Sequence, residues 1–208
     1  MAPPGRSVAA GQALVLRHEL TRKSLHLGAA VFPVAYGLGM SHRTLVQLLS
    51  AAAVLALATE TARWASPAAR ALFDRLFGSL MRGHEKESIS GATWLALSCL
   101  GAVVLFSREA AIAALWCATV GDPVAGITGR LWALARGTRA SGPGNKTLAG
   151  SLACATASFA GVWTLAGYPV AFAAAVGVAA AVAEAIPVRL DDNIRVAGVA
   201  GIVAQLLA

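Results

Sequence analysis

Apolar runs of roughly bilayer-spanning length recur along the whole of this 208-residue sequence. A helix needs about 20 mainly apolar residues to cross the hydrocarbon core of a membrane. The pattern predicts an all-α fold, a polytopic membrane helical bundle of about seven transmembrane helices, with residues 1–208 as a single integral membrane domain. The predicted spans are Ser24–Met40, Thr44–Thr59, Gly91–Phe106, Ala110–Ile127, Thr147–Ala166, Tyr168–Ile186 and Ile194–Leu207.

The composition excludes an ordinary soluble domain. Hydrophobic residues make up 57% of the chain and charged residues 13%, whereas about 25% of a soluble domain is charged. A net charge of +7 would indicate nucleic-acid binding in a soluble protein, but no basic patch interleaved with aromatic residues accompanies it. We therefore expect contact with membrane lipids and no nucleic-acid partner. Ser7–Leu16 is too short and poorly flanked for a signal peptide, and the three cysteines are expected to be packing residues.

The basic loop residues predict an orientation. If the seven spans alternate, nearly all of them fall on one side of the membrane, and only Arg43 and Arg108 lie on the other. Because loops that stay in the cytoplasm are rich in Lys and Arg, the N-terminus is predicted to be cytoplasmic and the C-terminus external. The clustered residues are Arg6, Arg17, Arg22, Lys23, Arg63, Arg70, Arg75, Arg82, Lys86, Arg130, Arg136, Arg139, Lys146, Arg189 and Arg195.

A polar stripe enters the first predicted span. Glu19, Arg22, Lys23 and His26 are spaced i, i+3, i+4 and i+7, which places them on one face of a helix. Long basic side chains at a membrane end often only reach back to the headgroups. His26, however, already lies within the apolar run, and ionisable residues there usually have a function.

The segment Gly121–Arg130 carries the strongest functional signal. Asp122 lies inside a predicted span, where a carboxylate is costly, and Pro123 suits the first turn of a helix, so we expect a broken or restarted helix here. Asp122, Gly126 and Arg130 are four residues apart and share a face. A carboxylate for a metal and an arginine for phosphate would suit a phosphorylated ligand. The alternative is an ion pair beside a glycine packing face.

Two further polar segments lie on the same predicted side. Lys146 and Thr147 open the fifth span, and a helix N-terminus with an ammonium group favours anions, although the spacing is not that of a Walker A loop. Glu184 and the run Asp191–Asn193 surround the last turn, and paired carboxylates suit Mg²⁺ held together with substrate phosphates. The alternative for Asp192 or Asn193 is a helix cap.

One weaker group precedes the third span. Arg82, Glu85 and Glu87 are followed by Ser90–Thr93. Taken alone, this pattern is typical of a solvated helix start with a capping serine.

Taken in order, the motifs resemble a known family. Arg22-Lys23 with His26, Gly91-Ala92-Thr93, the Gly-Asp-Pro segment ending at Gly129-Arg130, Lys146-Thr147 and Glu184 with Asp192-Asn193 are similar to the CTP-dependent polyprenol kinases. These include dolichol kinase, phytol kinase and the fungal-type diacylglycerol kinase. The middle of the chain also resembles the related phosphatidate cytidylyltransferases, but the Asp-Arg-x-Asp ending of those enzymes is absent.

The resemblance implies a membrane kinase that phosphorylates a lipid alcohol, expected to be an isoprenoid, with CTP as phosphate donor and Mg²⁺. The alternatives are a phosphatidate or prenyl-phosphate cytidylyltransferase and a small transporter or structural membrane protein. The implied metal ligands are Asp122 and Asp192, and the lipid hydroxyl would be oriented or deprotonated by Asp191, Glu184 or His26. The implied substrate- and nucleotide-binding residues are Arg22, Lys23, Arg130, Lys146, Thr147, Gly121, Gly126 and Asn193.

Overall fold

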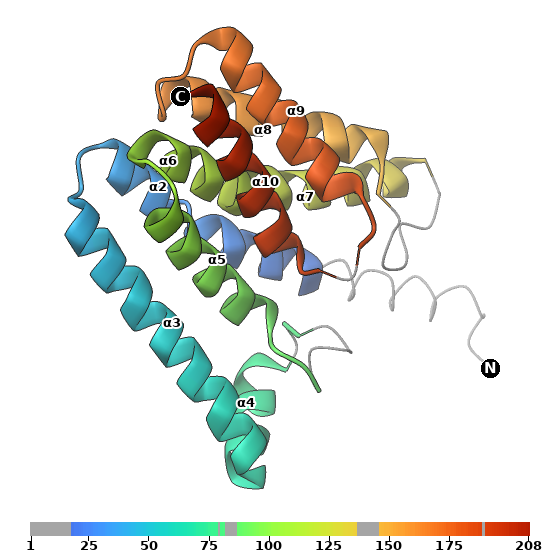
Figure 1. The fold of residues 1–208 in the computed structure, drawn as a ribbon. Coiled ribbons are helices and arrows are strands. Elements are labelled where there is room, and N and C mark those ends of the chain that lie inside the picture. The colour runs from blue at the N-terminus through green and yellow to red at the C-terminus, as the bar shows by residue number, and fades with distance from the viewer. Residues whose placement is uncertain (1–17, 79, 82–86, 137–145, 189) are drawn as a thin grey trace.

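The computed structural model describes residues 18–78, 80–81, 87–136, 146–188 and 190–208, and these form helices joined by short turns (Figure 1). No strand occurs in these ranges, so the all-α prediction is confirmed. The first helix covers residues 18–28. It is followed by α2 Val31–Gly37, α3 His42–Ala65, α4 Pro67–Phe77, α5 Gly91–Leu105, α6 Arg108–Trp116, the π-helical turn η2 Cys117–Gly121, α7 Asp122–Ala135, α8 Leu148–Thr164, α9 Val170–Ala185 and α10 Asp192–Leu207.

Several of these helices are apolar. Within the described ranges, α3 and the continuous helix Arg108–Ala135 are long and apolar enough to cross a membrane, while α5, α8 and α9 are shorter apolar helices. The count of seven spans and the cytoplasmic N-terminus stay predictions. Some of the charges used for the orientation, such as Arg6, Arg82 and Arg139, lie outside the described residues.

Many large apolar side chains lie on the surface of this fold, and several charged side chains lie inside it. In α3, Val54 and Leu55 are 67% and 70% exposed, whereas the carboxylates of Asp122 and Glu184 are almost wholly buried. Large apolar surface is unfavourable in water but matches lipid chains. This inverted distribution, with the apolar composition, suggests a membrane protein.

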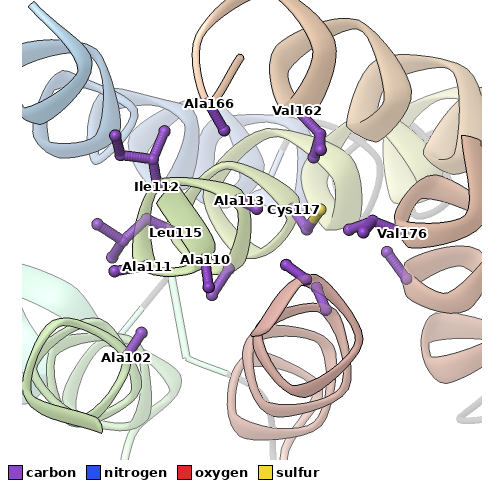
Figure 2. Close-up of a cluster of buried hydrophobic side chains, with 14 of the residues drawn as sticks. Ala102, Ala110, Ala111, Ile112, Ala113, Leu115, Cys117, Val162, Ala166 and Val176 are labelled. Atoms are coloured by element: carbon purple, nitrogen blue, oxygen red, sulfur yellow. The ribbon is translucent and has the colours of Figure 1, made fainter. Parts of the chain in front are cut away.

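The core is built around α6. Ala110, Ala111, Ala113 and Leu115 of this helix are fully buried, and Figure 2 shows them surrounded by side chains of neighbouring helices such as Val162 of α8. Alanines let helix backbones approach closely, which is a frequent way of packing helices in membranes. The central position of α6 fixes the direction of α7, which continues from it.

The helix starts follow from capping side chains. Ser41, Ser66, Ser90, Thr147 and Asp191 each accept a hydrogen bond from a backbone N–H in the first turn of the helix that follows. Such caps satisfy amide groups that have no partner within the helix. Polar residues between apolar runs therefore determine where α3, α4, α5, α8 and α10 begin.

Two predicted spans have different boundaries in the structure. The first, Ser24–Met40, is interrupted by a turn at residues 29–30, which places Pro33 in the first turn of α2, where its missing N–H is tolerated. The second extends beyond Thr59 to Ala65, because the charged side chains of Glu60 and Arg63 pair with each other inside the protein. Charge alone was a poor guide to the end of that helix.

The predicted irregularity at Asp122 takes the form of a restarted α-helix rather than a break, since α7 begins at Asp122 but Asp122 is not its cap. The helix runs on through Asp122 and Pro123, but it widens into the π-turn η2 immediately before them, with the Asp122 N–H bonded to the Cys117 carbonyl. A proline ring within an α-helix clashes with the carbonyl four residues earlier, here Thr119. A π-turn relieves such a clash without ending the helix.

Candidate functional site

A small polar pocket forms where four separate segments of the chain meet. The first helix, the start of α5, the start of α7 and the start of α10 each contribute to it. Its lining residues are Arg22, Lys23, His26, Gly91, Asp122, Asp191, Asp192 and Asn193. Seven of the thirteen predicted site residues therefore share one pocket, although up to 171 residues of sequence separate them.

Lys23 and Asp122 form the buried centre of this pocket. The Lys23 ammonium donates to the Asp122 carboxylate at 2.5 Å, and both side chains are nearly inaccessible to solvent. Gly126 makes this contact possible, because a Cβ there would lie 2.8 Å from Cε of Lys23. The glycine makes room for a lysine of the same protein, whereas its motif was interpreted as room for a ligand.

Glu19 joins the first helix to α7 beside the pocket. Its carboxylate pairs with Arg22 at 2.9 Å and with Arg130 at 3.4 Å. Glu19 and Arg22 of the predicted polar stripe therefore lie on the same face of the first helix. Arg130 of α7 lies next to this face, on the same side of α7 as Asp122, as their spacing predicts. Arg130 itself does not line the pocket.

A second charged cluster joins α8, α9 and α10. Lys146 pairs with the buried Glu184, and its ammonium lies 3.6 Å from the second oxygen of Asp192, while Arg195 pairs with the first. Burial lowers the pKa of Lys146, but the carboxylates of Asp192 and Glu184 outweigh it and raise that pKa above its usual value. Lys146 is therefore a fixed positive charge at neutral pH, next to a residue that lines the pocket.

The start of α10 is held by its own cap. The Asp191 carboxylate accepts from the backbone N–H of Asn193 at 2.9 Å and from its side-chain amide at 2.8 Å. The same amide donates to the Gly91 carbonyl at 3.3 Å, which ties α10 to α5. The cap that was considered for Asp192 or Asn193 is therefore made by Asp191.

Three buried polar atoms of the pocket residues have no hydrogen-bond partner within the part of the chain that the structure describes. They are Nε of Arg22, Nε2 of His26 and Oδ1 of Asn193. Buried polar groups are rarely left unsatisfied, because each costs free energy. Two nitrogens and an amide oxygen around one pocket indicate a place for water or a polar ligand.

The structure does not place Gly121 and Thr147 at the pocket. Gly121 packs against Ser158 of α8, whose Oγ would lie 2.3 Å from a Cβ at that position. Thr147 caps α8 by accepting from the Gly150 N–H at 3.0 Å, and Gly150 faces Gly129 across the α7–α8 contact. The neighbouring Gly144 and Asn145 lie outside the described residues.

Sequence reasoning missed a buried ion pair beside the pocket. Glu60 and Arg63 at the end of α3 pair with each other, and Glu60 also accepts from the Ser90 N–H at 2.8 Å and the Thr93 hydroxyl at 3.1 Å. Ser90 caps α5 as expected, but it is buried, so the solvated helix start was wrong. The signal available in the sequence was two opposite charges three residues apart in an apolar helix.

The residues fit a Mg²⁺ site that includes substrate phosphates. In the described ranges no group of three or more His, Cys, Asp or Glu side chains is arranged to hold a metal alone. Mg²⁺ is usually bound by only one or two carboxylates, with phosphates and water as the other ligands. Asp122 and Asp192 line one pocket, and Oδ1 of Asn193, which has no partner among the described residues, is a further hard oxygen there.

Three curated relatives are similar to this chain, and each is named CTP-dependent diacylglycerol kinase 1. The protein of Eremothecium gossypii is 31% identical over 144 residues, that of Schizosaccharomyces pombe 28% over 141 and that of Saccharomyces cerevisiae 26% over 155. The matches cover 67%, 65% and 74% of this chain. The chain spans about half the length of these relatives, with 43%, 62% and 52% of each covered.

No protein-family model matches the chain, and no solved structure does. The names of the curated relatives nevertheless agree with the family that the ordered motifs resemble. Together they confirm the resemblance and support placing this chain in the CTP-dependent lipid kinase family.

Proposed function

We propose that this protein transfers the terminal phosphoryl group of CTP to the hydroxyl of a lipid alcohol, with Mg²⁺, at the cytoplasmic face of a membrane that it crosses several times. The observation that carries the proposal is the pocket in which Lys23, Asp122 and Asp192 come together from three distant segments. Paired cations and carboxylates suit phosphoryl transfer, which depends on positioning and on neutralising charge.

The backbone around the pocket also favours a polyphosphate. Gly91, Asp192 and Asn193 line it at the starts of α5 and α10, and Lys146 precedes the start of α8. Helix N-termini present free amide groups and the positive end of the helix dipole. Negative charge bound in the pocket would meet the starts of α5 and α10 together with the ammonium and guanidinium groups of the site.

Each charged residue has a role that its contacts support. Asp122 and Asp192 would hold Mg²⁺, which supplies neutralising charge on the phosphates when it is bound. Each of these carboxylates is paired with a cation of the protein, Lys23 for Asp122 and both Arg195 and Lys146 for Asp192. The two lysines are therefore close enough to reach phosphate oxygens beside those carboxylates.

His26 is the group best placed to accept the proton of the lipid hydroxyl. Glu184 is occupied by Lys146, and Asp191 is occupied by the cap of α10. Nε2 of His26 lies among the pocket residues with no partner in the described ranges. In the reaction, the lipid oxygen bonds to the terminal phosphorus, the bond to the bridging oxygen breaks, CDP leaves, and the hydroxyl proton goes to the imidazole.

The acceptor is a lipid alcohol, and two classes compete. The motifs led us to expect an isoprenoid alcohol, whereas the names of the relatives favour diacylglycerol. Purified protein in mixed micelles should be given CTP, Mg²⁺ and each of these alcohols in parallel. The preferred acceptor is the one with the higher kcat/KM.

Phosphate-specific labelling tests the reaction itself. We expect label from the terminal phosphate of CTP to enter the lipid fraction with an alcohol acceptor, and label from the innermost phosphate to stay in soluble CDP. A Lys23→Gln variant should lose this transfer. Innermost label in the lipid, together with released pyrophosphate, would instead identify a cytidylyltransferase. No label in the lipid from either position would reject both reactions.

A further inference from the structure

Helix α4, Pro67–Phe77, is an amphipathic helix on the outside of the bundle. None of its residues is buried, and Leu72, Leu76 and Phe77 are 58%, 59% and 46% exposed. Leu72 and Leu76 are four residues apart and share a face. At about 100° per residue, Phe73 and Phe77 extend this apolar side, whereas Arg70, Asp74 and Arg75 occupy the remaining side of the helix. Helix α4 therefore has one apolar side and one charged side.

The position of α4 follows from the helix before it. Only Ser66 separates it from α3, which is long and apolar enough to cross a membrane. The backbone of Ser66 is extended, its hydroxyl accepts from Ala69 N–H, and Pro67 occupies the first position of α4. Because the chain turns here, α4 begins where the apolar helix ends (Figure 1). If α3 crosses a membrane, this end lies at the membrane surface.

A contact with α3 fixes which side of α4 faces the protein. The Arg63 guanidinium lies 5.4 Å from the centre of the Phe73 ring, and Arg63 is itself buried and paired with Glu60. Phe73 packs in turn against Phe77, with ring centres 5.2 Å apart. Phe73 therefore serves as the protein-facing anchor, and the leucines beside it remain exposed.

We propose that α4 lies in the lipid–water interface of the membrane that α3 crosses. In this arrangement Leu72, Leu76 and Phe77 enter the acyl-chain boundary, and Arg70 and Arg75 contact anionic headgroups. A helix with an apolar face and a basic polar face binds membranes in this way, and basic groups at a membrane surface are attracted to anionic lipids. The occupant of the exposed apolar face is thus lipid.

The interfacial helix would also set the depth of the pocket. Glu60, near the end of α3, binds Ser90, the residue before the pocket-lining Gly91. The end of α3 from which α4 starts and the rim of the pocket are therefore joined by a direct hydrogen bond. Anchoring α4 at the headgroups holds that rim near them as well, and this inference does not depend on which reaction the pocket performs.

Single-cysteine labelling of the full-length protein in vesicles tests the proposal. The native cysteines Cys99, Cys117 and Cys154 are buried, so the unsubstituted protein measures the background. A polarity-sensitive fluorophore is attached at Leu76→Cys and at Asp74→Cys, with Val54→Cys in α3 as a lipid-facing reference. Vesicles contain phosphatidylcholine with or without phosphatidylserine. Quenching by nitroxide-labelled lipids is compared with quenching by aqueous iodide.

At Leu76→Cys we expect lipid nitroxides to quench several-fold more strongly than iodide, and at Asp74→Cys we expect the reverse. Leu72→Cys should also be quenched more strongly by lipid nitroxides than by iodide, so the test does not depend on the correct folding of a single variant. Equal iodide quenching at Leu76→Cys and Asp74→Cys would show that α4 lies in water. Protection of Leu76→Cys from both quenchers would show that protein covers this residue. Either result would overturn the proposal. Arg70→Gln with Arg75→Gln should lower lipid quenching only in vesicles with phosphatidylserine, and an equal effect in both vesicles would remove the role of anionic lipid.

Discussion

Replacing Glu60 by glutamine tests whether the buried ion pair stabilises the junction between α3 and α5. Glu60 and Arg63 are 3% and 2% exposed. Glutamine keeps an oxygen that can accept from Ser90 and Thr93, but it leaves the Arg63 charge without its carboxylate. Removing one partner of a buried ion pair costs about 3–5 kcal/mol.

The structure places the effect of Glu60→Gln at the lower end of this range. Arg63 also donates to the Ser88 carbonyl at 2.6 Å and faces the Phe73 ring, and these contacts stay in the variant. We therefore expect a loss of about 3 kcal/mol. At about 2–4 °C per kcal/mol for a chain of this size, the melting temperature should fall by about 6–12 °C.

Thermal unfolding of four proteins in detergent measures how much the Glu60–Arg63 ion pair contributes to stability. The unsubstituted protein is compared with Glu60→Gln, with Arg63→Met and with the double variant. Because the two charges depend on each other, the double variant should lose clearly less stability than the sum of the single losses. Thr61→Ala, on the exposed side of the same helix turn, serves as a control and should change stability by less than about 0.5 kcal/mol. Additive losses, or a Glu60→Gln loss under about 1 kcal/mol, would refute the reasoning.

Three further predictions concern orientation and the pocket. Reporters inserted in the α5–α6 and α8–α9 turns should be external, and a cytoplasmic signal at either turn would contradict the predicted orientation. Asp122→Asn and Lys146→Ala should each lower phosphate transfer at least tenfold while membrane insertion stays normal; near-normal rates at limiting Mg²⁺ and low CTP would remove these residues from the site. Gly126→Ala should disturb the Lys23 contact and lower activity about tenfold with little loss of stability, whereas Gly101→Ala, which has open space around it, should be neutral in both assays.

The sequence predicted most helix positions because apolar runs and capping residues are local signals. Starts of α5, α8 and α10 lie within two residues of the predicted spans. Long-range pairing was not visible in the same way. The extension of α3 to Ala65 depends on Glu60 meeting Ser90, thirty residues later, and no local pattern specifies such a partner.

Residue types and predicted sidedness were enough to predict that Lys23, Asp122 and Asp192 lie together, and the structure places them around one pocket. Their individual contacts required the three-dimensional structure. The cap formed by Asp191 and the Lys146–Glu184 pair reduce the three candidate bases to His26 in our proposal. Gly126 is a second example. Its place in the motif predicted that another group lies close to the backbone there, but the structure shows that this group is the Lys23 side chain rather than a ligand.

The π-turn η2 can be understood as a single inserted residue in an otherwise regular helix. An α-helix advances about 100° per residue, so one extra residue in regular α-helical geometry would rotate everything that follows by that angle, whereas the wider π-turn absorbs it. Upstream of η2, α6 directs its alanines into the core, and downstream, Asp122 meets Lys23. If Cys117–Gly121 kept all five residues but adopted regular α-helical geometry, the carboxylate of Asp122 would turn by about 100°, away from its partner. The π-turn thus allows one continuous helix to direct its alanines into the core before the turn and the carboxylate of Asp122 toward Lys23 after it.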